Sequence, residues 1–184
     1  MPICLKHSKI PGCFEIIPEV FNDGRGTFIK TFHNGVFKEN RLEINFAEEY
    51  YSLSCKGVLR GLHFQLPPMD HVKLVYCVSG MVLDAVVDLR VGFRTYGEFE
   101  TFELSAEKAN MIYIPKGLAH GFYVLSESAI MMYKVSTVYS PEHDTGILWS
   151  SVGIPWPDKM PIISKRDSEF KSFTDFKSPF IYEK

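Results

Sequence analysis

The chain has 184 residues, of which 46% are apolar and 23% are charged, a balance typical of a globular protein with a sizeable core. Its formal net charge of −2 argues against nucleic acid or an acidic membrane as the main partner, although a local cation cluster could bind an anionic small molecule. Aromatic residues reach 14%, which favours strands and a ligand cavity over a helical bundle.

Cysteine usage and the N-terminal sequence bear on the compartment. The cysteines, Cys4, Cys13, Cys55 and Cys77, form no CxxC motif, and a chain of this length needs no disulfides to fold. The opening MPICLKHSKIPG lacks the apolar core of a signal peptide, and no apolar run approaches the length of a membrane span. We therefore expect a cytoplasmic protein with free thiols.

Short strand-like segments separated by turn signals dominate the chain. We expect strands at 14–21, 26–32, 44–54, 58–65, 72–78, 81–89, 97–104, 111–115, 120–125 and 129–139, and one helix at 35–42. Many short strands at close spacing favour a sandwich or barrel. From about Pro155 the sequence is rich in Pro and Lys, and it predicts a wrap of loops with one short helix around a single domain, 1–184.

The segment VLRGLHFQ (58–65) contains candidate functional residues in a strand. Residues two apart in a strand share a face. Strict alternation therefore places Val58, Arg60, Leu62 and Phe64 on one face and Leu59, Gly61, His63 and Gln65 on the other. A bulge at Gly61 would break this register.

A second strand, VKLVYCV (72–78), places Lys73, Val75 and Cys77 on one face. A lysine flanked by apolar residues is costly to bury unless an anion or a partner meets its charge. Lys73 lies either at a sheet edge or in a ligand cavity, and its basic and His neighbours favour the cavity.

Metal, nucleophilic and cofactor chemistry find little support. The run His63-Phe64-Gln65 lacks the HxH pair of a metal-binding cupin, and His71 follows the turn PPMD, so we expect it to point elsewhere. His63 and His120 alone fall short of the three protein ligands of most catalytic metals. There is no GxSxG, GxGxxG or P-loop, and no cysteine has a flanking His.

Acid–base chemistry remains, with His63 as the strand histidine in the most cationic neighbourhood. The competing interpretations are a core histidine with satisfied hydrogen bonds, and a core tyrosine at Tyr133 in the apolar run IMMYKVS. Asp88 and Arg90 are best explained as a structural ion pair at a strand end. Asp84 lies on the same face as Asp88, and one of the two could orient a group in the cavity.

Several longer segments extend the pattern across the chain. They are FNDGRGTF (21–28), KGVLRGLHFQLPP (56–68), KLVYCVSGMVLDAVVDLR (73–90), YIPKGLAHGFYVLSE (113–127), YKVSTVYSPEHDTGILW (133–149) and GIPWPDKMPIISKRD (153–167). Together they resemble, in order, the dTDP-4-dehydrorhamnose 3,5-epimerases, the RmlC-like cupins. The resemblance implies an all-β, cupin-type β jelly roll with short helical segments at the periphery, usually a homodimer.

The resemblance also implies an activity. The family's substrate is a nucleotide-diphosphate 4-keto-6-deoxy sugar, whose ketone acidifies the C–H bonds at C3 and C5. A base removes a proton, an enolate forms, and an acid on the opposite face returns a proton, without a cofactor. His63 matches the family base, and Asp167, in SKRD, matches the carboxylate that orients it. Lys73 matches the cation near O4, and Tyr133 matches the acid.

Other positions match the family's substrate-binding residues or depart from them. Arg25, Arg60 and His120 match residues that hold the diphosphate and sugar, and Arg25 and Phe28 lie in a segment that in the family reaches the neighbouring subunit's site. The departures are Lys30 for Glu, Glu48 and Tyr50 for Gln and Asn, Tyr76 for Arg, and Asp144 for Glu. The expected substrate-binding set is Arg25, Phe28, Lys30, Glu48, Tyr50, Arg60, Lys73, His120, Tyr139 and Asp144.

The departures leave substrate identity open. A Lys donates hydrogen bonds only, so Lys30, if it faces the base, would permit one with an acceptor edge such as cytosine. Glu48 near a pyrophosphate would repel it unless an arginine offset the charge. Besides the 3,5-epimerase, the sequence allows a single-carbon epimerase, including one acting on a CDP- or GDP-linked sugar, a ketosugar isomerase, a non-catalytic sugar-nucleotide binder and a metal cupin oxygenase.

Overall fold

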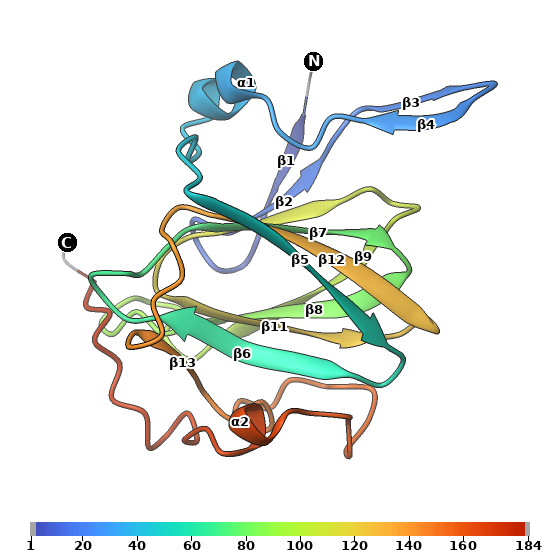
Figure 1. The fold of residues 1–184 in the computed structure, drawn as a ribbon. Helices are drawn as coiled ribbons and strands as arrows, with labels where there is room; N and C mark the ends of the chain where they lie inside the picture. The colour runs from blue at the N-terminus through green and yellow to red at the C-terminus, as the bar shows by residue number, and fades with distance from the viewer. Residues whose placement is uncertain (1–2, 183–184) are drawn as a thin grey trace.

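The computed structural model describes residues 3–182, which form two facing β-sheets with short helices at the periphery (Figure 1). The six-stranded sheet has the order β1 (Cys4–His7), β2 (Phe14–Ile17), β10 (Met111–Ile114), β7 (Lys73–Ser79), β12 (Ser128–Val135) and β5 (Glu48–Cys55). The five-stranded sheet has the order β13 (Asp144–Gly146), β6 (Leu59–Gln65), β11 (Leu118–Val124), β8 (Met81–Asp88) and β9 (Phe99–Ser105). The expected all-β jelly roll is confirmed.

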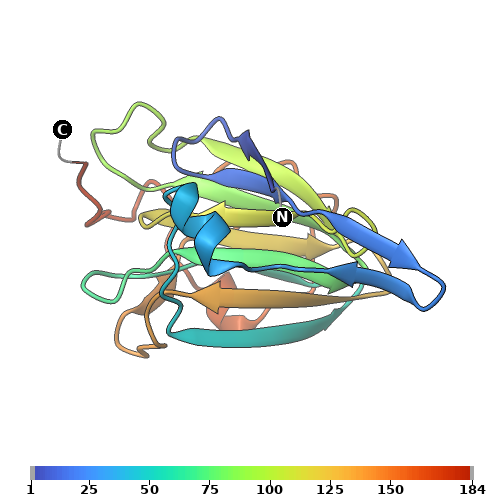
Figure 2. The same ribbon diagram turned by 90° about the horizontal axis from the view of Figure 1, so that it is seen from above.

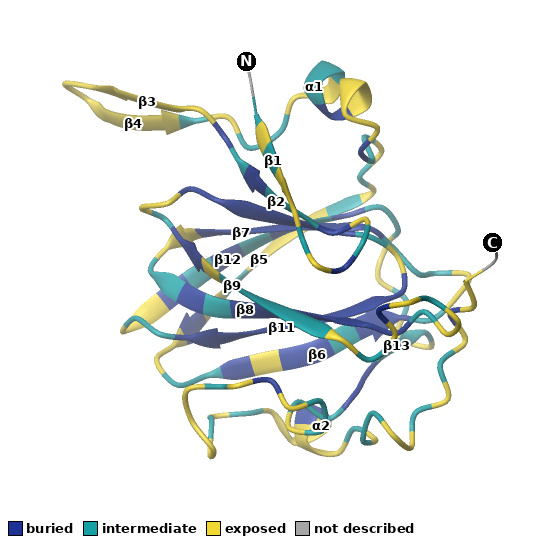
Figure 3. Ribbon diagram, turned by 180° about the vertical axis from the view of Figure 1, so that it is seen from behind, coloured by how far each residue is buried: buried dark blue, intermediate teal, exposed yellow. Residues whose placement is uncertain are grey.

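The remaining elements lie outside the two sheets. They are β3 (Val20–Asp23), β4 (Gly26–Ile29), α1 (Asn34–Glu39) and α2 (Lys165–Ser168). The β3–β4 hairpin projects away from the sheets in two perpendicular views (Figures 1 and 2), and nearly all of it is exposed (Figure 3). Among the described residues, neither helix is long and apolar enough to cross a membrane.

Most strand predictions are confirmed, with shifted ends. The expected strand 14–21 is wrong as one element, because Pro18 separates β2 from β3 and a proline has no N–H for a ladder. The expected strand 129–139 ends at Val135, after which the chain leaves the sheet. β1 and β13 were not predicted, since four and three residues are too few to show a period.

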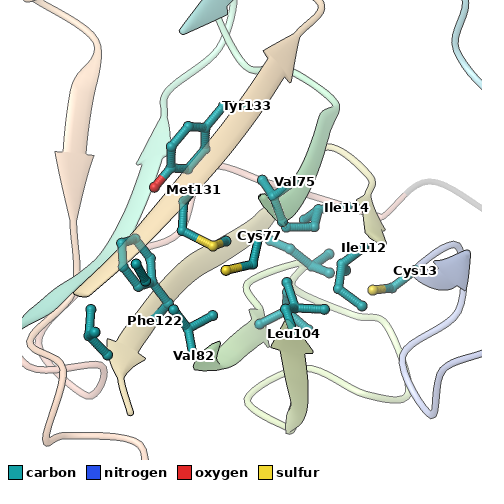
Figure 4. Packing of buried hydrophobic residues seen from close by; sticks show 14 of the residues in the cluster. Cys13, Val75, Cys77, Val82, Leu104, Ile112, Ile114, Phe122, Met131 and Tyr133 are labelled. Carbon is teal, nitrogen blue, oxygen red and sulfur yellow. The ribbon is translucent and has the colours of Figure 1, made fainter. Parts of the chain in front are cut away.

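The main core fills the space between the two sheets. Figure 4 shows this cluster, in which side chains from β7, β10 and β12 meet those from β8, β9 and β11. Val75 and Cys77 of β7 point into it, whereas Leu74 and Tyr76 pack on the outer face of the same sheet. The predicted alternation of β7 is therefore confirmed, and it directs Lys73 to the inside.

Two outer layers cover the sheets. The C-terminal wrap packs Ile154, Phe173, Phe176 and Phe180 on the outer face of the five-stranded sheet, against Leu62 and Phe64 of β6. On the other side, Phe37 of α1 packs on the outer face of the six-stranded sheet. The outer faces of both sheets are thus partly covered, although Tyr51 and Leu53 on the outer face of β5 remain exposed.

A bulge in β6 changes which side chains face the interior. His63 pairs with His120, but Arg60 pairs with Phe122, so the β6–β11 register shifts between them. Gly61 has a φ of 141°, and a Cβ there would lie 2.5 Å from the Cα of Gly121. Only glycine fits so close an approach of two strands.

The bulge corrects the strict alternation predicted for this strand. Arg60 does not share a face with Leu62. It lines the interior cavity together with His63, while Leu62 packs on the outer face. The register break considered at Gly61 is thereby confirmed.

Candidate active site

A cavity of about 350 Å³ opens between the two sheets, a volume suited to a small-molecule ligand. Nine of the residues expected from sequence line it: Glu48, Tyr50, Arg60, His63, Lys73, His120, Tyr133, Tyr139 and Asp144. Ser52, Gln65, His71 and Arg166 also line it. The residues come from both sheets and from the C-terminal wrap, so only the folded chain assembles them.

His63 of β6 meets Asp167 of α2. Its Nε2 lies 2.9 Å from Oδ2 of Asp167, whose carboxylate also accepts the Gly61 N–H at 3.2 Å. Ser164 caps α2 by accepting the Asp167 N–H at 3.1 Å, and this fixes the carboxylate behind the imidazole. A carboxylate accepts hydrogen bonds only, so it keeps a proton on Nε2 and leaves the lone pair on Nδ1.

The charge state of this pair suits proton abstraction. Burial lowers the pKa of His63, and the cations Lys73 and Arg166 act in the same direction, against Asp167, which raises it. Burial would raise the pKa of Asp167, but hydrogen bonds from His63, Gly61 and Arg166 prevail and lower it to about 2. At neutral pH the imidazole is therefore neutral beside an ionised carboxylate, the state a general base needs.

Arg166, which the sequence analysis did not single out, links three site residues. Its guanidinium pairs with Asp144 across the cavity rim and donates to Asp167 at 3.2 Å. Its Nη2 also lies 3.0 Å from His63 Nε2, but no hydrogen bond joins these two N–H groups, since Nε2 donates to Asp167. Its only sequence signal was its place next to Asp167 in SKRD. A charged residue in a helix of only four residues has no periodic pattern that would mark it.

Lys73 of β7 is buried, with 7% of its surface exposed, and lines the cavity. Its Nζ donates to the carbonyl oxygen of His63 at 3.2 Å, the single acceptor within hydrogen-bond range among residues 3–182. Burial lowers its pKa to about 8, and the charges of Asp144 and Asp84 oppose that shift. The ammonium therefore keeps N–H donors free, and the cavity placement predicted for Lys73 is confirmed.

Tyr133 of β12 enters the cavity from the six-stranded sheet. Figure 4 places it at one end of the main core, next to Met131. Its hydroxyl lies 3.1 Å from Ser52 Oγ, and the ring of Tyr50 stacks on its ring with centroids 4.7 Å apart. Burial raises the pKa of Tyr133 well above its usual range, so the phenol stays protonated and can act as an acid.

His120 and Asp84 form a second buried pair. His120 Nε2 lies 2.7 Å from Asp84 Oδ2, and both residues are at most 3% exposed. Asp84 is thus the acidic residue of β8 that orients a group in the cavity. Asp88 does not line the cavity. Its Oδ2 lies 2.7 Å from Arg90 Nη2, which is the structural ion pair expected from the sequence. Sequence spacing alone could not separate these two residues, because both lie on one face.

Three of the positions that depart from the family pattern, Glu48, Tyr50 and Asp144, line the cavity, whereas Tyr76 packs on the outer face of the six-stranded sheet. The carboxylate of Glu48 accepts the main-chain N–H of Tyr139 at 2.6 Å, so part of its charge is neutralised. Arg60 Nε donates to Ser54 Oγ at 2.9 Å, and this holds the guanidinium at the cavity wall. Arg60 and Arg166 are the two arginines that line the cavity.

His71 corrects an expectation, because it lines the cavity instead of pointing elsewhere. Its Nδ1 lies 3.1 Å from Thr137 Oγ1 and 3.3 Å from the side-chain nitrogen of Gln65. Burial, with the nearby cations Lys73 and Lys116, lowers its pKa to about 3. The side-chain amide of Gln65 donates to the Met69 carbonyl oxygen at 2.8 Å, a contact between the PPMD turn and a cavity residue that the sequence pattern did not reveal.

Three of the expected substrate-binding residues lie apart from this cavity. Arg25 and Phe28 are on the exposed β3–β4 hairpin, where Arg25 pairs with Asp23 at 2.6 Å, and Lys30 follows β4 on the surface. Within one chain, none of the three lines the site.

The described residues include no cluster of side chains that could ligate a metal ion. Within residues 3–182, no three His, Cys, Asp or Glu side chains lie close enough together to hold a metal ion. His63 and His120 each have a carboxylate partner instead. The donor set present is thus better suited to proton transfer, with a neutral imidazole and a protonated phenol opening on one cavity.

Known proteins resemble this chain over most of its length. The sequence model of the dTDP-4-dehydrorhamnose 3,5-epimerase family matches residues 7–175. A dTDP-4-dehydrorhamnose 3,5-epimerase of Shigella flexneri is 43% identical over 171 residues, 91% of this chain and 94% of the relative. A dTDP-4-dehydrorhamnose 3-epimerase of Streptomyces niveus is 39% identical over 168 residues, 90% of this chain and 81% of the relative.

A solved structure agrees over the full length. The crystal structure of a dTDP-6-deoxy-D-glucose-3,5-epimerase from Legionella pneumophila Philadelphia 1, in complex with dTDP-4-keto-L-rhamnose, superposes with a TM-score of 0.94. It is 33% identical, and the match covers 100% of both chains. The chain belongs to the dTDP-4-dehydrorhamnose 3,5-epimerase family.

Proposed function

We propose that this protein epimerises a dTDP-linked 4-keto-6-deoxy sugar, converting dTDP-4-dehydro-6-deoxyglucose to dTDP-4-dehydrorhamnose. The observation that carries the proposal is the placement of His63, paired with Asp167, and of Tyr133 on opposite walls of one cavity that Lys73 also lines. The names of the relatives supply the substrate class.

The proposed reaction uses only side chains of the chain. His63 removes the proton on a carbon next to the C4 ketone, and the electron pair of that C–H bond moves to O4. Lys73 stabilises the enolate charge on O4, which is greater in the transition state than in the substrate. Tyr133 then delivers a proton to the same carbon from the opposite face, and exchange with solvent restores both groups. Asp167 stabilises the imidazolium that forms.

Arg60, Arg166 and His120 are proposed to hold the diphosphate and the sugar. Arginine forks suit phosphate oxygens, and both arginines lie on the cavity wall. Glu48, Tyr50, Tyr139 and Asp144 would complete the binding surface.

A homodimer would explain the projecting hairpin. Phe21 and Phe28 of β3–β4 are 43% and 61% exposed, and an isolated two-stranded hairpin is marginally stable in water. We propose that it packs on a second copy and brings Arg25, Phe28 and Lys30 to the neighbouring cavity. Mixing inactive Arg25→Ala and His63→Ala subunits would then restore part of the activity. Light scattering would show a dimer, and a monomer would contradict this assembly.

The number of carbons inverted is the main alternative, since a relative of similar identity is a 3-epimerase. The protein is incubated with dTDP-4-dehydro-6-deoxyglucose in D₂O, and deuterium is located by NMR. Label at C3 and C5 supports the 3,5-epimerase, and label at one carbon supports the single-site enzyme. Absence of label contradicts turnover of this substrate.

The identity of the nucleotide is tested separately. The affinities for dTDP, CDP, GDP and UDP are compared in binding assays. A preference for dTDP would reject the hypothesis that Lys30 selects a base with an acceptor edge such as cytosine.

The cytoplasm is the proposed compartment, in keeping with four unpaired cysteines.

A further inference from the structure

Tyr50 and Tyr133 are direct neighbours across two strands. β5 and β12 run antiparallel, and their register pairs Tyr50 with Tyr133. The two rings face each other at 4.7 Å between centroids with an angle of 16° between their planes. Directly opposed residues share a face of the sheet, so both side chains project into the same cavity.

The two tyrosines differ in exposure. Tyr133 is 7% exposed, whereas Tyr50 is 41% exposed. Tyr50 therefore lies on the solvent side of the pair and covers one face of the Tyr133 ring. A flat aromatic contact restricts the ring over its whole face, which an aliphatic side chain of similar size does not reproduce.

A second restraint acts on the other end of Tyr133. Ser52 lies two residues after Tyr50 on the same face of β5, and its hydroxyl lies 3.1 Å from the Tyr133 hydroxyl. One strand thus supplies a hydrogen bond at the oxygen and a stack along the ring. Together they define the direction in which the phenol presents its proton.

We propose that Tyr50 is a positioning residue that holds the phenol of Tyr133 in the orientation needed to protonate the enolate. The inference rests on the proposed function, in which Tyr133 is the acid. Tyr50 acts through its ring and transfers no proton itself. Its removal should slow the protonation of the enolate by Tyr133 and leave the abstraction by His63 unchanged.

The partitioning of the enolate measures this role. In D₂O the His63 imidazolium exchanges the abstracted proton for deuterium, so an enolate that is not protonated by Tyr133 returns to substrate from the His63 side with deuterium and without inversion. We expect Tyr50→Ala to raise the ratio of labelled substrate to inverted product by about 2- to 10-fold, which corresponds to the free energy that one stacked aromatic pair contributes. Tyr50 also lines the binding surface, so KM can rise in this variant, but a weaker binding step does not change how the enolate partitions. Tyr50→Phe keeps the ring and should keep the wild-type ratio, whereas Tyr50→Leu should behave like Tyr50→Ala.

A matched control comes from the next residue. Tyr51 is 66% exposed and lies on the opposite face of β5, so Tyr51→Ala removes the same side chain without touching Tyr133. Its ratio should equal that of the wild type. An equal rise in Tyr51→Ala would assign the effect to β5 as a whole and overturn the role of Tyr50.

A second readout needs no turnover. With 3-fluorotyrosine introduced at position 133, the wild type should give one sharp fluorine resonance, and Tyr50→Ala should broaden or shift it. An unchanged resonance would overturn the positioning role even if the proposed substrate were wrong. A changed resonance with an unchanged partition ratio would show that the stack does not affect proton delivery, which also overturns the inference. Failure of the wild type to exchange or invert the sugar would count against the proposed function alone.

Discussion

The imidazole of His63 and the phenol of Tyr133 enter one cavity from opposite sheets, His63 from β6 and Tyr133 from β12. A planar enolate bound between them would present one face to each wall. Inversion of a stereocentre requires removal of a proton on one face and return on the other. The packing of two sheets supplies that arrangement.

The base is tested by removing the imidazole. We expect His63→Ala to lower kcat by about 10²- to 10⁴-fold, the usual contribution of a general acid–base group. Exchange of the C–H protons should fall by the same factor, because no enolate forms. Sugar-nucleotide binding, measured by calorimetry, should be nearly unchanged. Retained exchange in this variant would assign the base to another residue.

Tyr133→Phe should separate abstraction from inversion. The ring and its stack on Tyr50 remain, but the proton donor is gone. Inverted product should fall by about 10²-fold or more, while deuterium still enters recovered substrate through His63. NMR on the same incubation measures both quantities. A parallel loss of exchange and inversion would contradict the division of roles.

The ionisation of Lys73 should determine how kcat/KM falls at basic pH. Burial lowers its pKa to about 8, so its charge is present below that pH and is lost above it. We expect kcat/KM to fall as the pH rises through about 8, since a neutral amine stabilises the enolate less well. The kcat profile should begin to fall at a higher pH than the kcat/KM profile, because the negative charge of the bound diphosphate raises the pKa of Lys73 in the complex. Lys73→Met should lower kcat by about 10²- to 10³-fold and abolish this limb.

Asp167 and Arg166 should shift the acidic side of the profile in opposite directions. Asp167 raises the pKa of His63, so Asp167→Asn lowers it further, moves the acidic limb of kcat/KM to lower pH and weakens the base. Arg166 lowers that pKa, so Arg166→Gln should move the limb to higher pH. Profiles of both variants against wild type give the comparison. Shifts of the same sign would indicate a general structural effect.

The sequence allowed prediction of most strands and of the residues that line the cavity, because alternation and turn signals act locally. Lys73 was placed correctly, since β7 alternates without interruption. Arg60 was placed on the wrong face, because the register shift at Gly61 depends on how closely β11 approaches. Arg166 and His71 were missed as cavity residues, since Arg166 lies in the four-residue helix α2 and His71 in a loop, and the position of both depends on distant contacts. The hairpin residues fell outside the cavity of their own chain, a position that no local pattern encodes.

Gly61 and Gly121 limit how the cavity could be redesigned. A Cβ at Gly121 would lie 2.7 Å from the Arg60 carbonyl oxygen, and one at Gly61 would lie 2.5 Å from the Gly121 Cα. Any side chain at either position would separate the strands that present Arg60, His63 and His120. A mutagenesis library aimed at new sugar substrates should therefore keep both glycines and vary rim positions such as Glu48, Tyr139 and Asp144, whose side chains can change without moving a strand.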